Sequence, residues 1–114
     1  MATKPGPAKF TVEPTASREE LNRLFERIAA YCRETPARAV LVRVQGRPQI
    51  STADLLAAVA SLQQACAEGF KLAWVSADRE THELIGHTEY PTTRVGIQSR
   101  VFFDEVNAGR WLAW

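Results

Sequence analysis

The sequence predicts an α/β domain, and three observations favour that class. Short apolar segments rich in β-branched residues alternate with longer segments whose apolar residues recur every three or four positions. The chain has 114 residues, 46% of them hydrophobic, which suits one domain with one core. Two apolar segments, 39–44 and 70–76, flank one helical pattern, so we expect them to lie parallel as a βαβ unit.

The N-terminal residues are rich in Pro and Gly and lack apolar periodicity. Such a composition buries too little apolar surface to offset the entropy of ordering, so we expect a flexible tail over 1–9 and the folded domain over 10–114. A short strand is expected at 10–13 because Pro14 ends the apolar segment.

The first helix is expected to begin after Ser17, because Ser17 and Glu20 have the spacing of a capping box. The helix is expected to end before Pro36, since the residue before a proline avoids the helical conformation. One apolar stripe is expected to face the core: Leu21, Leu24, Phe25, Ile28, Ala29 and Cys32.

Segment 39–44 is apolar at most positions and predicts a central strand that is covered on both faces. A loop at 45–50 leads to a second helix, for which Ser51 and Asp54 form a weaker capping box. Gly69 is expected to close this helix in a left-handed conformation, and the next strand follows at 70–76.

The last third of the chain predicts a short helix, a strand and a closing helix. Asp78 is a candidate cap for the short helix, and the segment 89–94 reads as a polar turn. The last strand is expected at 99–103, and Asp104 is expected to cap a helix that carries Ala108 and Trp111 on its apolar side.

Charge and hydropathy narrow the class of partner. The chain has 14 basic and 13 acidic residues, and a net charge of +1 gives no general attraction for nucleic acid or anionic lipid. The longest apolar run, 55–60, is far shorter than the roughly 20 residues of a membrane span. With no secretory signal pattern, we expect a cytoplasmic protein in which Cys32 and Cys66 are reduced, buried and inert.

The motifs of catalysis are not evident in the sequence, so we expect a protein that is not an enzyme and needs no cofactor. His82 and His87 are five residues apart, whereas two zinc ligands on one helix face are four apart. The segment 46–52 has one glycine and no Lys-Ser/Thr pair, so it meets neither the Walker nor the dinucleotide pattern. We expect no metal site and no catalytic residues.

The best candidate for a functional surface is the loop at 45–50 with the start of the second helix. It follows the carboxyl end of the central strand, where open α/β sheets bind ligands and partners. The residues expected to contact a partner are Arg47, Gln49, Ser51, Thr52 and Asp54. For Ser51, a plain capping role is the competing interpretation.

These elements and landmarks together resemble STAS domains, and among them the SpoIIAA-like branch of small bacterial proteins. The resemblance covers about 10–112 and rests on segments 39–44, 50–56 and 69–75 and on Val101-Phe102-Phe103-Asp104 followed by Ala108, Trp111 and Leu112. It implies a mixed sheet of four to five strands with about four helices packed against it. It also implies a regulatory role without catalysis, in which the chain binds a protein such as an anti-sigma factor or its kinase.

The same resemblance bears on phosphorylation. The motif of anti-sigma-factor antagonists, Asp-Ser-Ser/Thr-Gly-Leu, places Ser51 at the Asp, Thr52 at the first hydroxyl, Ala53 at the phosphorylated residue and Asp54 at the Gly. Since Ala53 has no hydroxyl, Ser51 and Thr52 are the remaining candidates for modification.

A second function stays open because the SpoIIAA-like branch is similar in fold to lipid-carrying Sec14-type domains. That likeness suggests a small apolar ligand between the last helices and the sheet, near Phe70, Trp74, Phe102 and Trp111. Its weakness is volume, because a chain of this size has little spare core for a pocket. An exposed Trp114 would contact a partner or a second copy of the chain, as in a homodimer.

Overall fold

A computed structural model of the chain describes residues 8–35, 38–66, 69–94 and 96–114. These residues form four strands and five helices, of which one has five residues. In chain order the elements are β1 (Lys9–Val12), α1 (Arg18–Glu34), β2 (Ala39–Val44), α2 (Thr52–Ala60), β3 (Phe70–Val75), α3 (Arg79–Gly86), α4 (Glu89–Thr93), β4 (Ile97–Phe102) and α5 (Glu105–Leu112).

The strands form one sheet in the order β1-β2-β3-β4, and all three pairings are parallel. The predicted parallel pairing of β2 with β3, bridged by α2, is confirmed, with Val42 opposite Trp74. The mixed sheet is not: the described strands contain no antiparallel pair. At least one helix connects each strand to the next. Such a crossover brings the chain back to the end of the sheet where the previous strand began, so neighbouring strands run parallel.

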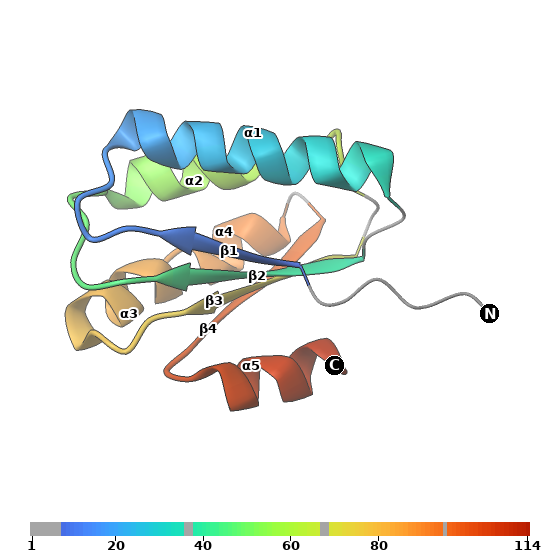
Figure 1. The fold of residues 1–114 in the computed structure, drawn as a ribbon. Helices are drawn as coiled ribbons and strands as arrows, with labels where there is room; N and C mark the ends of the chain where they lie inside the picture. The colour runs from blue at the N-terminus through green and yellow to red at the C-terminus, as the bar shows by residue number, and fades with distance from the viewer. Residues whose placement is uncertain (1–7, 36–37, 67–68, 95) are drawn as a thin grey trace.

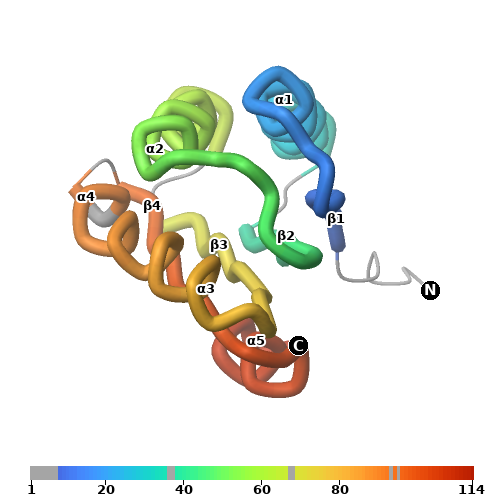
Figure 2. The backbone as a smooth tube through the Cα atoms, turned by 90° about the vertical axis from the view of Figure 1, so that its left-hand side faces the viewer, coloured from blue at the N-terminus to red at the C-terminus, as the bar shows by residue number. Residues whose placement is uncertain are grey.

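The main core lies between the sheet and the helices α1 to α4 (Figures 1 and 2). Figure 1 shows α1 and α2 side by side over one face, and Figure 2 shows α3 and α4 beside β4. Val40, Val42, Leu72 and Trp74 point into this core from the two central strands, and each is fully buried. The indole of Trp74 stacks on Phe25 of α1, with ring centroids 5.6 Å apart.

The opposite face of the sheet is covered by α5 (Figure 1). Leu41 and Ala73 from the central strands meet Ala108 and Leu112 from α5 in a smaller cluster. The central strands are therefore buried on both faces, as the apolar run at 39–44 predicted for the first of them. Ion pairs from Lys9 and Arg43 to Glu105 connect β1 and β2 to the first turn of α5.

The ends of several elements differ from the predictions. The second helix ends at Ala60 rather than near Gly69. At this end the Ser61 hydroxyl donates to the Ala58 carbonyl at 2.6 Å and competes with the helical backbone hydrogen bonds. Gly69 does adopt the expected left-handed conformation, with φ of 81°. The polar segment predicted as a turn contains α4, and the last strand begins two residues early, at Ile97.

The N-terminal boundary moves by two residues: Lys9 belongs to β1, and Ala8 packs against the main core and accepts the backbone N–H of Leu41 at 3.0 Å. The rest of the predicted tail, 1–7, lies outside the described residues. Within the described ranges, no helix combines the length and the apolar character of a membrane span.

Candidate functional site

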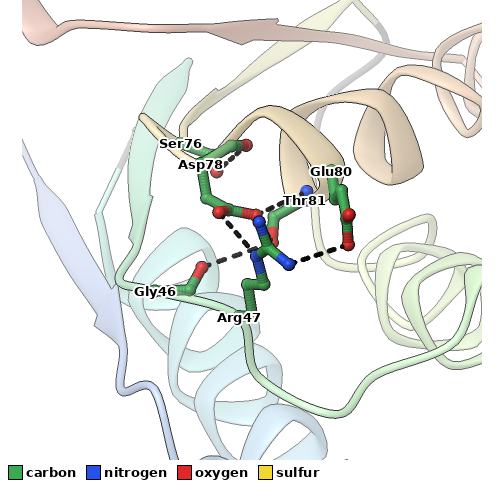
Figure 3. A network of polar contacts seen from close by, with 6 residues as sticks. All are labelled: Gly46, Arg47, Ser76, Asp78, Glu80 and Thr81. Carbon is green, nitrogen blue, oxygen red and sulfur yellow. Dashed lines mark hydrogen bonds and ion pairs between the residues drawn. The ribbon is translucent and has the colours of Figure 1, made fainter.

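The loop after β2 and the first turn of α3 meet in a network of polar contacts at the carboxyl end of the sheet (Figure 3). Arg47 reaches from the loop to two carboxylates: its Nε donates to Oδ1 of Asp78 at 2.7 Å, and its Nη1 donates to Oε2 of Glu80 at 3.1 Å. The hydroxyl of Thr81 donates to the carbonyl oxygen of Gly46 at 3.2 Å. Two neighbouring parallel strands end at the same edge, and this brings the two loops together.

Asp78 is the centre of the network. It caps α3, since its carboxylate accepts the backbone N–H of Thr81 at 3.0 Å, and it pairs with Arg47 through its other oxygen. The hydrogen bond from Arg47, followed by that from the Thr81 backbone, holds the pKa of the Asp78 carboxyl below its ordinary value. In turn, the hydrogen bond to Asp78 raises the pKa of Arg47, so both groups stay charged over the ordinary pH range.

Gly46 lets the loop turn towards α3. Its φ of 60° is left-handed, and a Cβ built at this position would lie 3.2 Å from Cβ of Pro14. The positive φ and the close approach of Pro14 therefore favour glycine at position 46, and the Gly46 carbonyl is aimed at Thr81.

The first turn of α2 carries the capping box that the sequence predicted. Ser51 Oγ accepts the backbone N–H of Asp54 at 3.1 Å, and the Asp54 carboxylate accepts the backbone N–H of Ser51 at 3.0 Å. Ser51 is exposed, while Thr52 and Asp54 are half-buried. The competing interpretation of Ser51 as a cap is confirmed, and its hydroxyl is already committed to the helix.

The five predicted contact residues thus lie on one continuous segment but in different surroundings. Arg47 keeps 61% of its side chain exposed although it forms two ion pairs. Gln49 is exposed and lies between the Arg47 network and the cap of α2. A partner at this surface would meet a loop that is held at both ends by internal contacts.

Sequence reasoning missed the part of the site that lies beyond β3. The sequence predicts only a capping role for Asp78, and no local pattern marks Glu80 or Thr81. The predicted parallel pairing of β2 and β3 contained the missing signal, because it places the residues after both strands at one edge. The sequence also does not predict a ring contact beside Thr81 in α3. His82 stacks on Phe103 with ring centroids 3.7 Å apart and planes within 3°, and Phe103 is 54% exposed.

The four residues suggested for an apolar ligand do not come together. Phe70 and Trp74 are buried in the main core, whereas Phe102 and Trp111 pack in the cluster under α5 on the opposite face. The apolar hollow beside Trp74 has a volume of about 10 Å³, enough for one water molecule. Trp114 is 45% exposed.

A larger hollow of about 210 Å³ lies between β1 and α1. Its lining includes the charged side chains of Glu13, Glu20 and Arg27. This volume is below the roughly 300 Å³ at which small-molecule pockets begin, and none of the four suggested ligand residues lines it.

The strand order also bears on the site. In open α/β sheets the ligand crevice forms where the strand order reverses, because the helices on either side of that point diverge onto opposite faces. The order β1-β2-β3-β4 has no such reversal. The strand order therefore provides no such crevice in the described sheet, and the apolar hollow under the 45–50 loop, which Pro48 and Ile50 help to line, is the small one of about 10 Å³ beside Trp74.

Metal-ligating residues are not grouped in the part of the chain that the structure describes: no three His, Cys, Asp or Glu side chains lie close enough to hold an ion.

The chain matches no family model, no curated protein and no solved structure. What the coordinates define is a small α/β domain with a four-stranded parallel sheet and a pre-ordered loop surface at one end of it.

Proposed function

We propose that this protein is a non-enzymatic regulatory module, similar to STAS domains, that binds a protein partner through the loop at 45–50 and the first turn of α2. The observation that carries the proposal is a loop that is exposed yet held in place. Arg47 and Gly46 are bound to α3 at one end, and the capping box fixes the other end. A binding loop that is ordered before it meets its partner loses less conformational entropy on binding.

The chemistry of this surface favours a protein partner. It presents the Gln49 amide, the Arg47 guanidinium and the Glu80 carboxylate, and both signs of charge lie within one ion-pair network. A polyanion such as nucleic acid would meet Asp78 and Glu80 beside Arg47, and the neighbouring Arg79 is itself paired with Glu83, so repulsion opposes the attraction. The proposal includes a bacterial, cytoplasmic protein, in line with the resemblance and with two free cysteines.

Phosphorylation enters the proposal only at Ser51 or Thr52. Ser51 is the more accessible of the two, but its Oγ accepts from the backbone of Asp54, and the Asp54 carboxylate lies against the Ser51 N–H. A phosphate on Ser51 would bring about two negative charges next to that carboxylate and would repel it from the Ser51 N–H. Modification there would therefore break half of the capping box and change the charge of the docking surface.

The test is a comparison of three baits in affinity capture from the source organism: the wild type, a double variant and a control. Gln49→Ala combined with Ala53→Glu changes the shape and charge of the surface, while a negative charge in the first turn of α2 suits the helix dipole. The matched control is Arg23→Ala on the exposed side of α1. We expect a protein that the wild type and the control retain and the double variant loses, at equal unfolding temperatures.

Two results would overturn the proposal. The first is a set of captured proteins that is identical for all three baits, which would place docking elsewhere on the chain. The second is loss of a partner that parallels loss of thermal stability, which would show that the loop is structural only.

A further inference from the structure

The two cysteines of the chain lie side by side. Cys32 is in the last turn of α1 and Cys66 follows α2 by six residues, yet their Sγ atoms are 3.2 Å apart, with Cys66 donating to Cys32. They are 34 positions apart in sequence. The sequence predicted two separate, inert core residues, and the structure instead makes them a pair.

Packing explains why the pair forms. Cys32 continues the apolar stripe of α1 beyond Ile28, which is fully buried. Beyond α2, the fully buried Leu62 anchors the chain, and its carbonyl accepts the backbone N–H of Cys66 at 2.9 Å. Both cysteines remain only half-buried, at the end of the sheet where β2 and β3 begin.

The separation of the two sulfur atoms is close to bonding distance. A disulfide bond is about 2.05 Å long, so each Sγ would have to move by only about 0.6 Å. Cys66 lies beyond the end of α2, in a segment of turns, so a shift of this size does not disturb a regular helix.

We propose that Cys32 and Cys66 form a reversible dithiol site that a small-molecule disulfide of the glutathione class oxidises to an internal disulfide. In the first step, the Cys32 thiol loses its proton and its sulfur attacks one sulfur of the reagent. A mixed disulfide forms at Cys32, and the other half of the reagent leaves as a thiol.

In the second step, the Cys66 sulfur loses its proton and attacks the Cys32 sulfur. The Cys32–Cys66 bond forms, and the second half of the reagent leaves as a thiol. Two protein thiols have then lost two electrons and two protons, and one disulfide reagent has become two thiols, so atoms and electrons balance.

The surroundings assign the order of attack. The hydrogen bond that Cys66 donates helps a negative charge on Cys32, which makes Cys32 the first nucleophile. Burial raises the pKa of both thiols, and it raises that of Cys66 strongly. The positive charge of Arg33 offsets only part of the rise at Cys66. The site is therefore slow to oxidise at neutral pH, in contrast to a peroxide-sensing cysteine with a low pKa.

The experiment uses the reduced full chain in mixtures of glutathione and glutathione disulfide. Samples are quenched with acid, their free thiols are alkylated in denaturant, and the mass of the intact protein is measured by mass spectrometry. We expect both thiols to disappear together, with no glutathione left on the protein, and dithiothreitol to restore both. The oxidised monomer should unfold about 10 °C higher, because the bond closes a loop of roughly 35 residues in the unfolded chain.

Variants separate the roles of the two sulfurs. Cys66→Ser should stop at one glutathione adduct on Cys32, since the resolving thiol is gone. If that variant fails to fold, the wild type alone decides the question: ring closure should be at least about tenfold less favourable in guanidinium chloride than in the folded chain, because folding holds the sulfurs together.

The proposal is overturned if both thiols stay free in excess glutathione disulfide, if the folded wild type retains glutathione adducts, or if the disulfide joins two chains. None of these outcomes concerns the docking surface, because Arg47 lies at the opposite end of the strands from the cysteines. The dithiol site and the proposed partner binding therefore stand or fall separately.

Discussion

The indole Nε1–H of Trp74 donates to the hydroxyl of Ser99 at 3.0 Å, and both side chains lie in the main core. Trp74 is on β3 and Ser99 on β4, so this bond joins the last strand to the centre of the sheet. Trp74 is fully buried and Ser99 nearly so. Neither group can replace this partner with bulk water.

Ser99→Ala should lower the free energy of unfolding by about 1–3 kcal/mol, because it leaves a buried indole N–H without an acceptor. Urea denaturation followed by tryptophan fluorescence measures the change. The control is Gln98→Ala on the exposed side of the same strand, which should change stability by less than about 0.5 kcal/mol. Equal effects of the two variants would mean that the buried hydrogen bond adds little.

Ser51→Ala should cost about 1 kcal/mol, because the N–H of Asp54 loses its acceptor at the start of α2. Ser51→Asn should restore most of that loss, since asparagine is an equally good cap. Both variants are compared with the wild type by urea midpoints. A Ser51→Ala protein as stable as the wild type would show that the capping box does not stabilise α2.

Gly46→Ala and Gly69→Ala form a matched pair. Both glycines have positive φ, so each substitution should strain the backbone by about 1–2 kcal/mol. Only at Gly46 would the new Cβ also crowd a neighbour, Cβ of Pro14 at 3.2 Å; at Gly69 no described atom lies within 4 Å. Gly46→Ala should therefore be the more destabilising of the two in thermal melts, and the reverse order would contradict the close approach of Pro14.

Arg47→Ala should destabilise the protein slightly at pH 7 and less at pH 3. The pKa of Asp78 is lower in the folded state than in the unfolded chain, so its ion pair stabilises the fold above the unfolded pKa of about 3.9. That stabilisation is lost as the pH falls through the folded pKa. Urea midpoints at both pH values check this, with Arg23→Ala as the control, and a pH-independent difference would assign the effect to packing of the Arg47 side chain.

Some of the fold follows from local sequence signals and some does not. The capping box at Ser17 and the β-branched run at 39–44 are short-range patterns, and α1 and β2 appear where these patterns place them. The end of α2 depends on a competing hydroxyl bond at Ser61, which outweighs a helical pattern that continues to Cys66.

The candidate site shows the same division. Its capping half, Ser51 with Asp54, is a local pattern and was predicted. Its other half depends on which loops the sheet brings together. The carboxylates that pair with Arg47 therefore follow from the strand order and not from a local sequence pattern. The cysteine pair is a contact of this second kind, since 34 positions separate the two residues and no spacing motif connects them.

The sequential order of the four strands has a consequence for how the domain assembles. Each strand pairs with the one made just before it, so a chain emerging from the ribosome can extend its sheet at a growing edge without waiting for a distant segment. The helix that covers the second face, α5, is synthesised after all four strands. Until α5 has emerged, Leu41 and Ala73 remain open to water, so the nascent domain carries a temporary apolar surface that this later helix closes.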